Sequence, residues 1–259
     1  MFLTFEDIQQ FKKYINRCSK NIDLECYYII DNITDYDIID NIEVLNKVTK
    51  LCITGNDITT SLYNLTNLQY LDCSYTDITT IPKELGNLQY LDCSSTQIKK
   101  IPKRLYKLET LICVEVNIAK IPREFVNLRV LNCSYSNITE ISNRFINLRI
   151  LNCDYTNVTE IPKELVLLEQ LRCNNTNITE IPKSLSNLRI LNCSNTYVSK
   201  IPEELVLLEV LHCNCTYIIE IPVTLNLLKD LEHSTKSITL KEHKENILSS
   251  KEKKKDLNK

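Results

Sequence analysis

Residues 68–87 read LQYLDCSYTDITTIPKELGN and contain the features that decide the fold. Leu71 and Cys73 alternate with polar neighbours, which is the two-residue period of a β-strand with one buried face. Thr76 follows, and its hydroxyl can satisfy backbone groups in a turn. Pro82 holds the preceding residue extended and cannot donate to a strand ladder. We therefore expect a short strand, a turn and an irregular return leg.

The same pattern returns every 20 residues. Eight cysteines share one phase, from Cys73 to Cys213, and the seven prolines share another, with Ser142 in their one gap. Eight defining positions were compared over eight copies, beginning at Leu68. They match in 62 of 64 cases when Ser is allowed for Thr, Val for Ile and Phe for Leu, and the exceptions are Val116 and Ser142. A fixed period of this length indicates a solenoid of stacked coils.

Stacking these coils places one parallel strand from each coil in a continuous sheet, with neighbouring strands about 4.8 Å apart. The predicted fold class is therefore an α/β solenoid with a parallel β-sheet on the concave face. Only about half of each 20-residue unit remains for the return leg, which is too short for a long α-helix. We expect extended or 3₁₀ segments on the convex face.

The unit L-x-x-L-x-C-x-x-T-x-I-x-x-I-P-x-x-L resembles the leucine-rich-repeat family, in its short 20-residue type. Cys stands where the family has its third Leu, and Thr or Ser stands where it has Asn. A degenerate first copy begins at Val48 and keeps the family residue at Asn56. The resemblance implies a right-handed coil. Low Gly and abundant Asn, Ile and Lys are also similar to repeat proteins of large DNA viruses of amoebae.

The ends of a solenoid expose apolar core unless they are capped. We expect residues 1–47 to form an N-terminal cap, a helix plus a degenerate strand within residues 24–30. Thr4 and Asp7 have the spacing of a capping box, and the apolar residues Phe5, Ile8, Phe11 and Ile15 recur at helical spacing. Residues 48–240 are expected to form about ten coils. Residues 241–259 carry seven Lys against four Asp or Glu, which predicts a polar tail, either a loose helix or disordered.

Composition disfavours several classes of protein. The chain is 43% hydrophobic and 25% charged, as in soluble globular proteins, and its net charge of -2 gives no strong attraction to nucleic acid or anionic membranes. Two glycines imply few tight turns that need positive φ, which argues against an enzyme built on Gly-rich loops. The opening MFLTFED lacks the features of a signal peptide, and no run approaches the roughly 20 apolar residues of a membrane span. We expect an intracellular, cytoplasmic protein, in the host cell if it is viral.

The cysteine column is the most prominent chemical feature. In the repeat register these side chains face the core, where a free Cys behaves as a small apolar residue. Disulfides between successive coils are within reach, but parallel side chains make the required dihedral angle difficult. Unpaired thiols in such number indicate a reducing compartment. His212 and Cys213 alternate to opposite faces, so we expect no zinc there. The chain has no Gly-rich phosphate loop, H-E-x-x-H or G-x-S-x-G motif, and we predict no enzyme activity, no cofactor and no metal.

The outward positions of the predicted sheet mix tyrosine, aliphatic and amide groups. Tyrosine, with an apolar body and a polar tip, is favoured in recognition surfaces. Ile112 and Val114 are expected to be exposed apolar groups in the repeat that lacks its Thr, which indicates either a contact or simple drift. The predicted partner-binding residues are Tyr70, Asp72, Tyr75, Tyr90, Asp92, Ile112, Val114, Glu115, Asn132, Tyr135, Asn152, Tyr155, Arg172 and His212.

The sequence thus predicts a non-catalytic scaffold that binds an unidentified partner protein on the concave face of the sheet. No small-molecule substrate and no membrane span are expected, and nucleic acid is disfavoured because the predicted face is not basic. The alternative is an adaptor that recruits ubiquitin machinery or another effector through its N-terminal cap.

Overall fold

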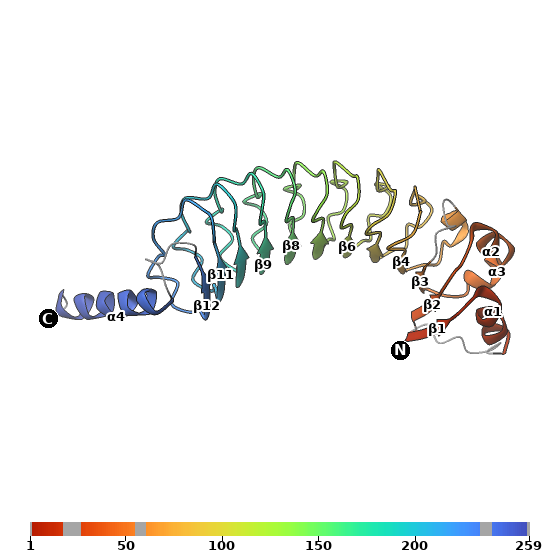
Figure 1. Ribbon diagram of the computed structural model, residues 1–259, viewed down its shortest axis with the longest axis horizontal. Helices are drawn as coiled ribbons and strands as arrows, with labels where there is room; N and C mark the ends of the chain where they lie inside the picture. Colours follow the sequence, from red (N-terminus) through yellow and green to blue (C-terminus); the bar gives the residue numbers. More distant parts are fainter. Residues whose placement is uncertain (1, 18–26, 55–60, 234–239, 258–259) are drawn as a thin grey trace. The chain divides into compact units, whose positions relative to one another are not determined.

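The computed structural model of the chain describes residues 2–17, 27–54, 61–233 and 240–257. It divides into two compact units, residues 1–137 and 138–259, and each unit is a stack of coils (Figure 1). The described residues contain twelve strands, and within each unit every strand pairs in parallel with the next strand along the chain. The predicted solenoid with a parallel sheet is confirmed.

The first unit begins with longer strands and short helices before the regular coils. Its strands are β1 (Phe2–Phe5), β2 (Tyr27–Ile30), β3 (Lys50–Ile53), β4 (Tyr70–Asp72), β5 (Tyr90–Asp92), β6 (Thr110–Ile112) and β7 (Val130–Asn132). Its helices are α1 (Ile8–Arg17), α2 (Asp35–Asp40), α3 (Ile42–Leu45) and the 3₁₀ helix η1 (Ser61–Asn64).

The second unit continues the regular coils and ends in a helix. Its strands are β8 (Ile150–Asn152), β9 (Gln170–Arg172), β10 (Ile190–Asn192), β11 (Val210–His212) and β12 (Asp230–Glu232), and its helix is α4 (Leu240–Leu257).

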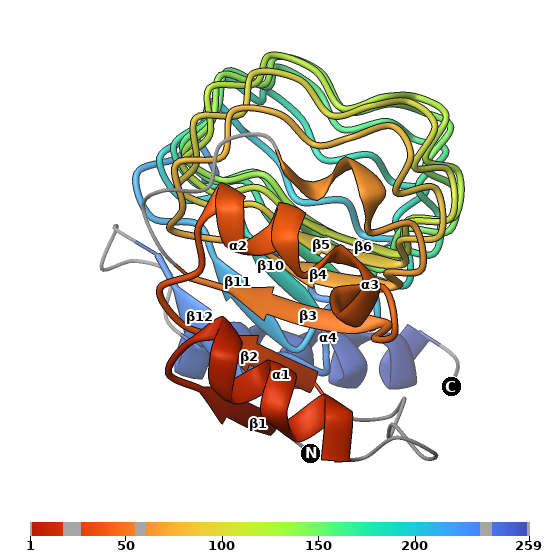
Figure 2. The ribbon, with the colours of Figure 1, turned by 90° about the vertical axis from the view of Figure 1, so that its right-hand side faces the viewer.

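Every coil buries the same positions of the repeat. In the quoted stretch Leu71, Cys73, Ile78 and Leu85 are fully buried and Ile81 is 4% exposed. Figure 2 looks along the coils and shows β4, β5 and β6 together on one side, with the return legs on the other. The core of each unit therefore lies between the sheet and the return legs.

The return legs consist of tight turns, as predicted. The Leu85 N–H donates to the Pro82 carbonyl oxygen at 3.3 Å, and the Leu88 N–H donates to the Leu85 carbonyl oxygen at 3.1 Å. Both bonds span three residues, which is the spacing of 3₁₀ structure.

A side-chain hydroxyl bonds across the turn in seven of the eight regular coils. The Thr76 hydroxyl donates to the Cys73 carbonyl oxygen at 2.7 Å, and Thr156 makes the same bond to Cys153 at 2.7 Å. Related bonds recur in the coils of Thr96, Ser136, Thr176, Thr196 and Thr216. The predicted role of this position is therefore confirmed in seven coils.

The residue before that hydroxyl has a left-handed backbone in all eight coils. The φ angles of Tyr75, Ser95, Glu115, Tyr135, Tyr155, Asn175, Asn195 and Cys215 lie between 51° and 57°. The expectation that two glycines imply few positive-φ turns is therefore wrong. The left-handed region costs an L-residue roughly 1–2 kcal/mol, and a bond to the next coil supports it here, since the Tyr75 N–H donates to the Ser94 carbonyl oxygen at 2.9 Å.

Val116 is the exception among the turns. It is buried at 2% exposure and has no hydroxyl to offer to Cys113. The turn nevertheless keeps the same shape at Glu115, where φ is 56°. The Ile118 N–H instead donates to the Val116 carbonyl oxygen at 2.9 Å. The sequence irregularity at this position therefore corresponds to the loss of one buried hydrogen bond.

The N-terminal residues differ from their predicted capping. Thr4 lies in β1, so it does not cap a helix. The Asp7 carboxylate instead accepts from the Gln10 N–H at 2.8 Å and caps α1. Ile8, Phe11 and Ile15 form the buried face of α1, as their spacing predicts. Phe5 reaches this cluster from β1, with its ring centroid 5.4 Å from that of Phe11.

A capping box does occur further along, at the start of α2. The Thr34 side chain accepts from the Asp37 N–H, and the Asp37 side chain accepts from the Thr34 N–H. Part of the degenerate first copy of the repeat lies in β3, where Leu51 and Ile53 are buried. Its Asn56, and residues 24–26 of the predicted strand, lie outside the described residues.

The C-terminal helix α4 packs on the coils of the second unit through two side chains. His243 is 3% exposed and Ile247 is 8% exposed. The His243 Nε2 atom lies 2.9 Å from the Leu225 carbonyl oxygen. The polar segment after residue 240 is thus helical as far as Leu257, and its first turns are anchored to a coil. No described helix is long and apolar enough to cross a membrane.

Candidate functional site

The exposed face of the sheet presents the residues that flank the buried Leu of each strand. Leu71 points into the core, while Tyr70 and Asp72 lie on the other face and are partly exposed. Nine of the fourteen predicted residues occupy this face in the strands. They are Tyr70, Asp72, Tyr90, Asp92, Ile112 and Asn132 in the first unit, and Asn152, Arg172 and His212 in the second.

Four predicted residues lie in turns and not in strands. Each regular strand has three residues and ends before the cysteine, so Tyr75, Glu115, Tyr135 and Tyr155 occupy the left-handed turn position. Tyr75 is the most exposed of the three tyrosines, at 76%. This row therefore borders the sheet face along the carboxyl ends of the strands.

Ile112 and Val114 are less exposed than predicted, because both side chains are only partly exposed. Val114 follows the strand, and its N–H donates to the Ser94 hydroxyl oxygen at 3.1 Å. This bond ties the irregular repeat to the coil before it.

An aromatic row runs across the first unit. The rings of Tyr70 and Tyr90 are stacked, with centroids 4.1 Å apart and planes 10° from parallel. Tyr27 meets Tyr70 edge-on at 4.7 Å, and the Lys50 ammonium lies 4.9 Å from the centroid of the Tyr27 ring. Tyr27 was missed because residues 24–30 were not aligned to the repeat, and Lys50 was missed because the outward positions were compared only from the copy that begins at Leu68. The sequence signal for Lys50 is its place directly before Leu51, which is the place that Tyr70 has before Leu71.

Two carboxylates lie beside this row. Asp72 and Asp92 are register partners in β4 and β5. The Asp92 carboxylate accepts from the Ser94 N–H at 2.9 Å and from its hydroxyl at 2.7 Å. Burial raises the pKa of Asp92, the bonds from Ser94 oppose that rise, and the charge of Asp72 adds to it. Burial and then the charge of Asp72 raise the pKa of the nearby Cys52 thiol to about 12.

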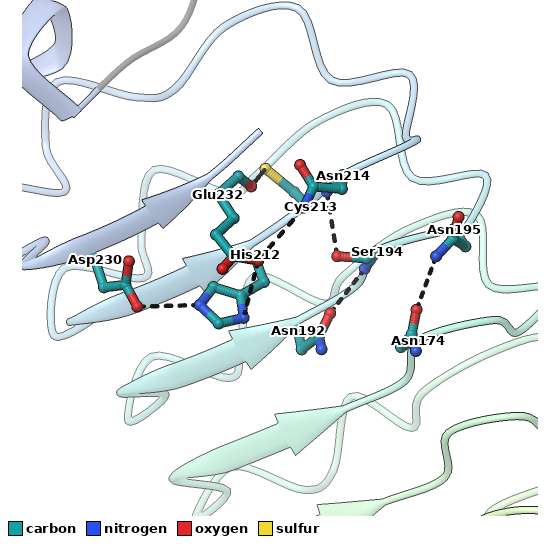
Figure 3. A network of polar contacts seen from close by, with 9 residues as sticks. All are labelled: Asn174, Asn192, Ser194, Asn195, His212, Cys213, Asn214, Asp230 and Glu232. Carbon is teal, nitrogen blue, oxygen red and sulfur yellow. Dashed lines mark hydrogen bonds and ion pairs between the residues drawn. The ribbon is translucent and has the colours of Figure 1, made fainter. Parts of the chain in front are cut away.

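The second unit presents a different surface, in which polar groups bond mainly to one another (Figure 3). The His212 Nε2 atom lies 3.1 Å from Asp230 Oδ2, and its Nδ1 atom lies 3.6 Å from Glu232 Oε2. The Asn214 amide donates to Glu232 at 3.4 Å, and its N–H donates to the Ser194 hydroxyl at 3.2 Å. This network joins neighbouring strands to one another.

The cysteine column is fully buried in both units, from Cys73 to Cys213. The Cys73 thiol donates to the Asp92 carbonyl oxygen at 3.3 Å, and the Cys173 thiol to that of Asn192 at 3.4 Å. Burial raises the pKa of both thiols well above their ordinary value. None of the ten described cysteines is in a disulfide, and within the described ranges no group of three or more His, Cys, Asp or Glu is arranged to hold a metal ion. The column is a packing element, as its phase predicts.

An open cleft of about 510 Å³ lies along the turns of the second unit, lined by side chains that include Asn175, Asn195, Tyr197, Cys215 and Tyr217. The rings of Tyr197 and Tyr217 are stacked with centroids 6.3 Å apart. Cys215 is exposed, unlike the cysteines of the column. None of these five residues is among the predicted partner-binding residues.

Comparison with known proteins agrees with this geometry. Residues 40–142 match a family model described as a leucine-rich repeat region. A functional domain of InlJ from Listeria monocytogenes, which includes a cysteine ladder, is similar in structure, with a TM-score of 0.68 and 25% sequence identity. This chain has the leucine-rich-repeat solenoid fold. The similarity covers 92% of the solenoid chain and 58% of the InlJ chain, so the chain spans little more than half of that relative.

Two further structures share the leucine-rich-repeat fold. A leucine-rich-repeat protein of Leptospira interrogans has a TM-score of 0.64 and 20% identity over 90% of this chain and 72% of its own. An internalin of Listeria monocytogenes has a TM-score of 0.51 and 18% identity over 88% of this chain and 89% of its own. No curated protein matches the sequence. At these identities the two structures inform on the fold alone.

Proposed function

We propose that the leucine-rich-repeat solenoid is a non-catalytic scaffold that binds a partner protein on the exposed face of its sheet. The observation that carries the proposal is the separation of constant and variable positions. Each coil fixes its buried Leu, Ile and Cys, whereas the exposed positions change from Tyr70 and Asp72 to Ile190 and Asn192. A partner can be recognised by such positions without any change in the core.

Within this proposal each segment has its own role. Residues 1–47 cap the coils, residues 48–240 form them, and residues 241–259 are a tail anchored through α4. Buried cysteines that form no disulfide among the described residues support a reducing, intracellular compartment.

Affinity capture from cytosol tests the proposal. One variant combines Tyr70→Ser and Tyr90→Ser on the sheet face with Tyr135→Asn and Tyr155→Asn in the turns. Asn is chosen for the turns because the same column already holds Asn175 and Asn195 with the same backbone. The matched control is Tyr106→Ser, which removes an exposed tyrosine from a return leg.

The expected result is a protein that wild type and Tyr106→Ser capture and the face variant does not. Circular dichroism and thermal unfolding must show that all three proteins are folded. Equal capture by all three would remove the sheet face from consideration.

A second candidate function is an adaptor that recruits an effector through its N-terminal residues. One observation favours it, because Tyr36 and Ile39 on α2 are 82% and 52% exposed and lie three residues apart on one helix. Deleting the N-terminus would be a poor test, since β1 pairs with β2 and α1 packs on Tyr28. If the adaptor function is correct, the wild type should capture an effector as well as the partner on the sheet face. The double variant Tyr36→Ser with Ile39→Ser should lose the effector and keep that partner.

A further inference from the structure

The structural task of Asp72 and Asp92 does not require a negative charge. Each carboxylate accepts the N–H of the residue two positions on, at 3.0 Å in Ser74 and 2.9 Å in Ser94. In other coils the same position is Asn, and its side-chain oxygen accepts the equivalent N–H. Asn152 does so at 3.0 Å and Asn192 at 3.1 Å. An amide oxygen is therefore sufficient to accept this hydrogen bond. The negative charge of Asp72 and Asp92 is not needed for the turn.

That charge is also unfavourable in the free protein. Like charges in register on neighbouring strands repel each other, and Asp72 contributes to the raised pKa of Asp92. Elsewhere neighbouring coils pair opposite charges at the position just before the strand, since Glu109 lies 3.4 Å from Arg129 and Glu209 lies 2.9 Å from Arg189. Among the described residues, neither Asp72 nor Asp92 has a Lys or Arg within ion-pair distance.

The aromatic row beside the carboxylates already holds one cation. Lys50 is the register partner of Tyr70, and its ammonium lies over the Tyr27 ring at 4.9 Å. An aromatic face attracts a Lys or Arg side chain through its quadrupole. The stacked rings of Tyr70 and Tyr90 extend this row along β4 and β5, on the same face as the carboxylates of Asp72 and Asp92.

We infer that the patch formed by Tyr70, Asp72, Tyr90 and Asp92 binds a lysine- or arginine-bearing segment of the partner. The inference rests on the proposed function and names the chemical class of its partner. The carboxylates pair with the cationic head groups, and the tyrosine rings contact their alkyl stems. Binding relieves the repulsion between the two carboxylates that the free protein tolerates.

The probe is a fluorescent peptide of alternating Lys and Ser, with a Glu and Ser peptide of equal length as its counterpart. Affinity is measured by fluorescence anisotropy at 50 and 200 mM NaCl. Asp72→Asn with Asp92→Asn should raise the Kd for the Lys peptide at least tenfold, while the urea midpoint of unfolding stays equal to wild type or rises. Glu203→Gln with Glu204→Gln changes the net charge equally on a return leg and should leave the Kd unchanged.

Four outcomes would overturn the inference, and three of them concern the peptides. They are equal affinity of wild type and the Asn variant, an equal loss in the return-leg control, or equal binding of the Glu peptide. Self-association of the wild type that the Asn variant abolishes would assign the patch to the Lys-rich tail of a second copy, and would also overturn it. Capture of a cytosolic partner could be lost in the tyrosine variant while the Kd for the Lys peptide is unchanged in the Asp72 and Asp92 variant. The proposed function would then stand, and only the inference that the partner segment is cationic would be wrong.

Discussion

The Thr156 hydroxyl makes a buried hydrogen bond that can be removed without changing the shape of the side chain. It donates to the Cys153 carbonyl oxygen at 2.7 Å, and Thr156 is 5% exposed. Thr156→Val keeps the branched shape and removes the donor. A hydrogen bond contributes about 0.5–1.5 kcal/mol, and a buried group that loses its partner costs about 1–3 kcal/mol. We expect Thr156→Val to lower the free energy of unfolding by about 1–2 kcal/mol.

Val116 permits the reverse experiment in the same protein. It occupies the equivalent position with an equivalent backbone, since φ is 56° at Glu115 and 54° at Tyr155. Val116→Thr should restore the missing bond to Cys113 and raise the free energy of unfolding by about 0.5–1 kcal/mol.

Urea unfolding followed by circular dichroism measures both changes. For a slope of about 3 kcal/mol per molar urea, shifts of a few tenths of a molar are expected, in opposite directions for the two variants. If Val116→Thr destabilises the protein as much as Thr156→Val does, the hydroxyl does not hold the turn and the reasoning is wrong.

Three other predictions follow from the core, the turns and the last helix. Burial raises the pKa of Cys213 to about 12 from an ordinary value of 9.0. The contribution of this thiol to the free energy of unfolding is therefore complete below pH 9 and is lost as pH rises toward 12. The loss is up to about 1.4 kcal/mol per pH unit. Urea titrations at pH 8, 9 and 10 should show a shallower decline for Cys213→Ala, and an unchanged slope would contradict this. Because φ at Tyr155 is 54°, Tyr155→Asn should leave the Tm unchanged or higher and Tyr155→Val should lower stability by about 1–2 kcal/mol; equal Tm values for the two would show that the backbone is not strained. His243→Ala with Ile247→Ser should release α4 from its coil and speed trypsin cleavage after Lys244, with Leu248→Ser, an exposed position, as control.

The sequence was sufficient for the repeating part of the fold because one period fixes strand, turn and core together. The phase of Leu71 and Cys73 correctly predicts the buried row, and Pro82 correctly predicts a return leg without helix. The left-handed turns were missed because only Asn175 and Asn195 of the eight turn residues are of a type that favours positive φ, whereas Tyr75 and the others are not. Only a bond between coils, at a separation of 19 residues, explains them.

The candidate face could be predicted in its positions but not in its interactions. Alternation along the strand is a local property, so it places Asp72 and Asp92 on the outer face from sequence alone. The stack of Tyr70 on Tyr90, and the cation over Tyr27, depend on which residues share a register across strands. The start of α1 at Ile8, with Asp7 as its cap, was mispredicted because Thr4 was assigned to a helix cap when it pairs in β1.

A coil of constant length also determines how such a protein can change over time. Each strand pairs only with its immediate neighbours in its unit, so gain or loss of one whole 20-residue segment keeps every cysteine above another cysteine. An insertion of another length within a strand would place a different residue of the repeat against that column. Copying errors in the gene are therefore tolerated in whole coils, and each new coil brings its own exposed residues. The binding face can lengthen, shorten or change its composition while the interior stays the same.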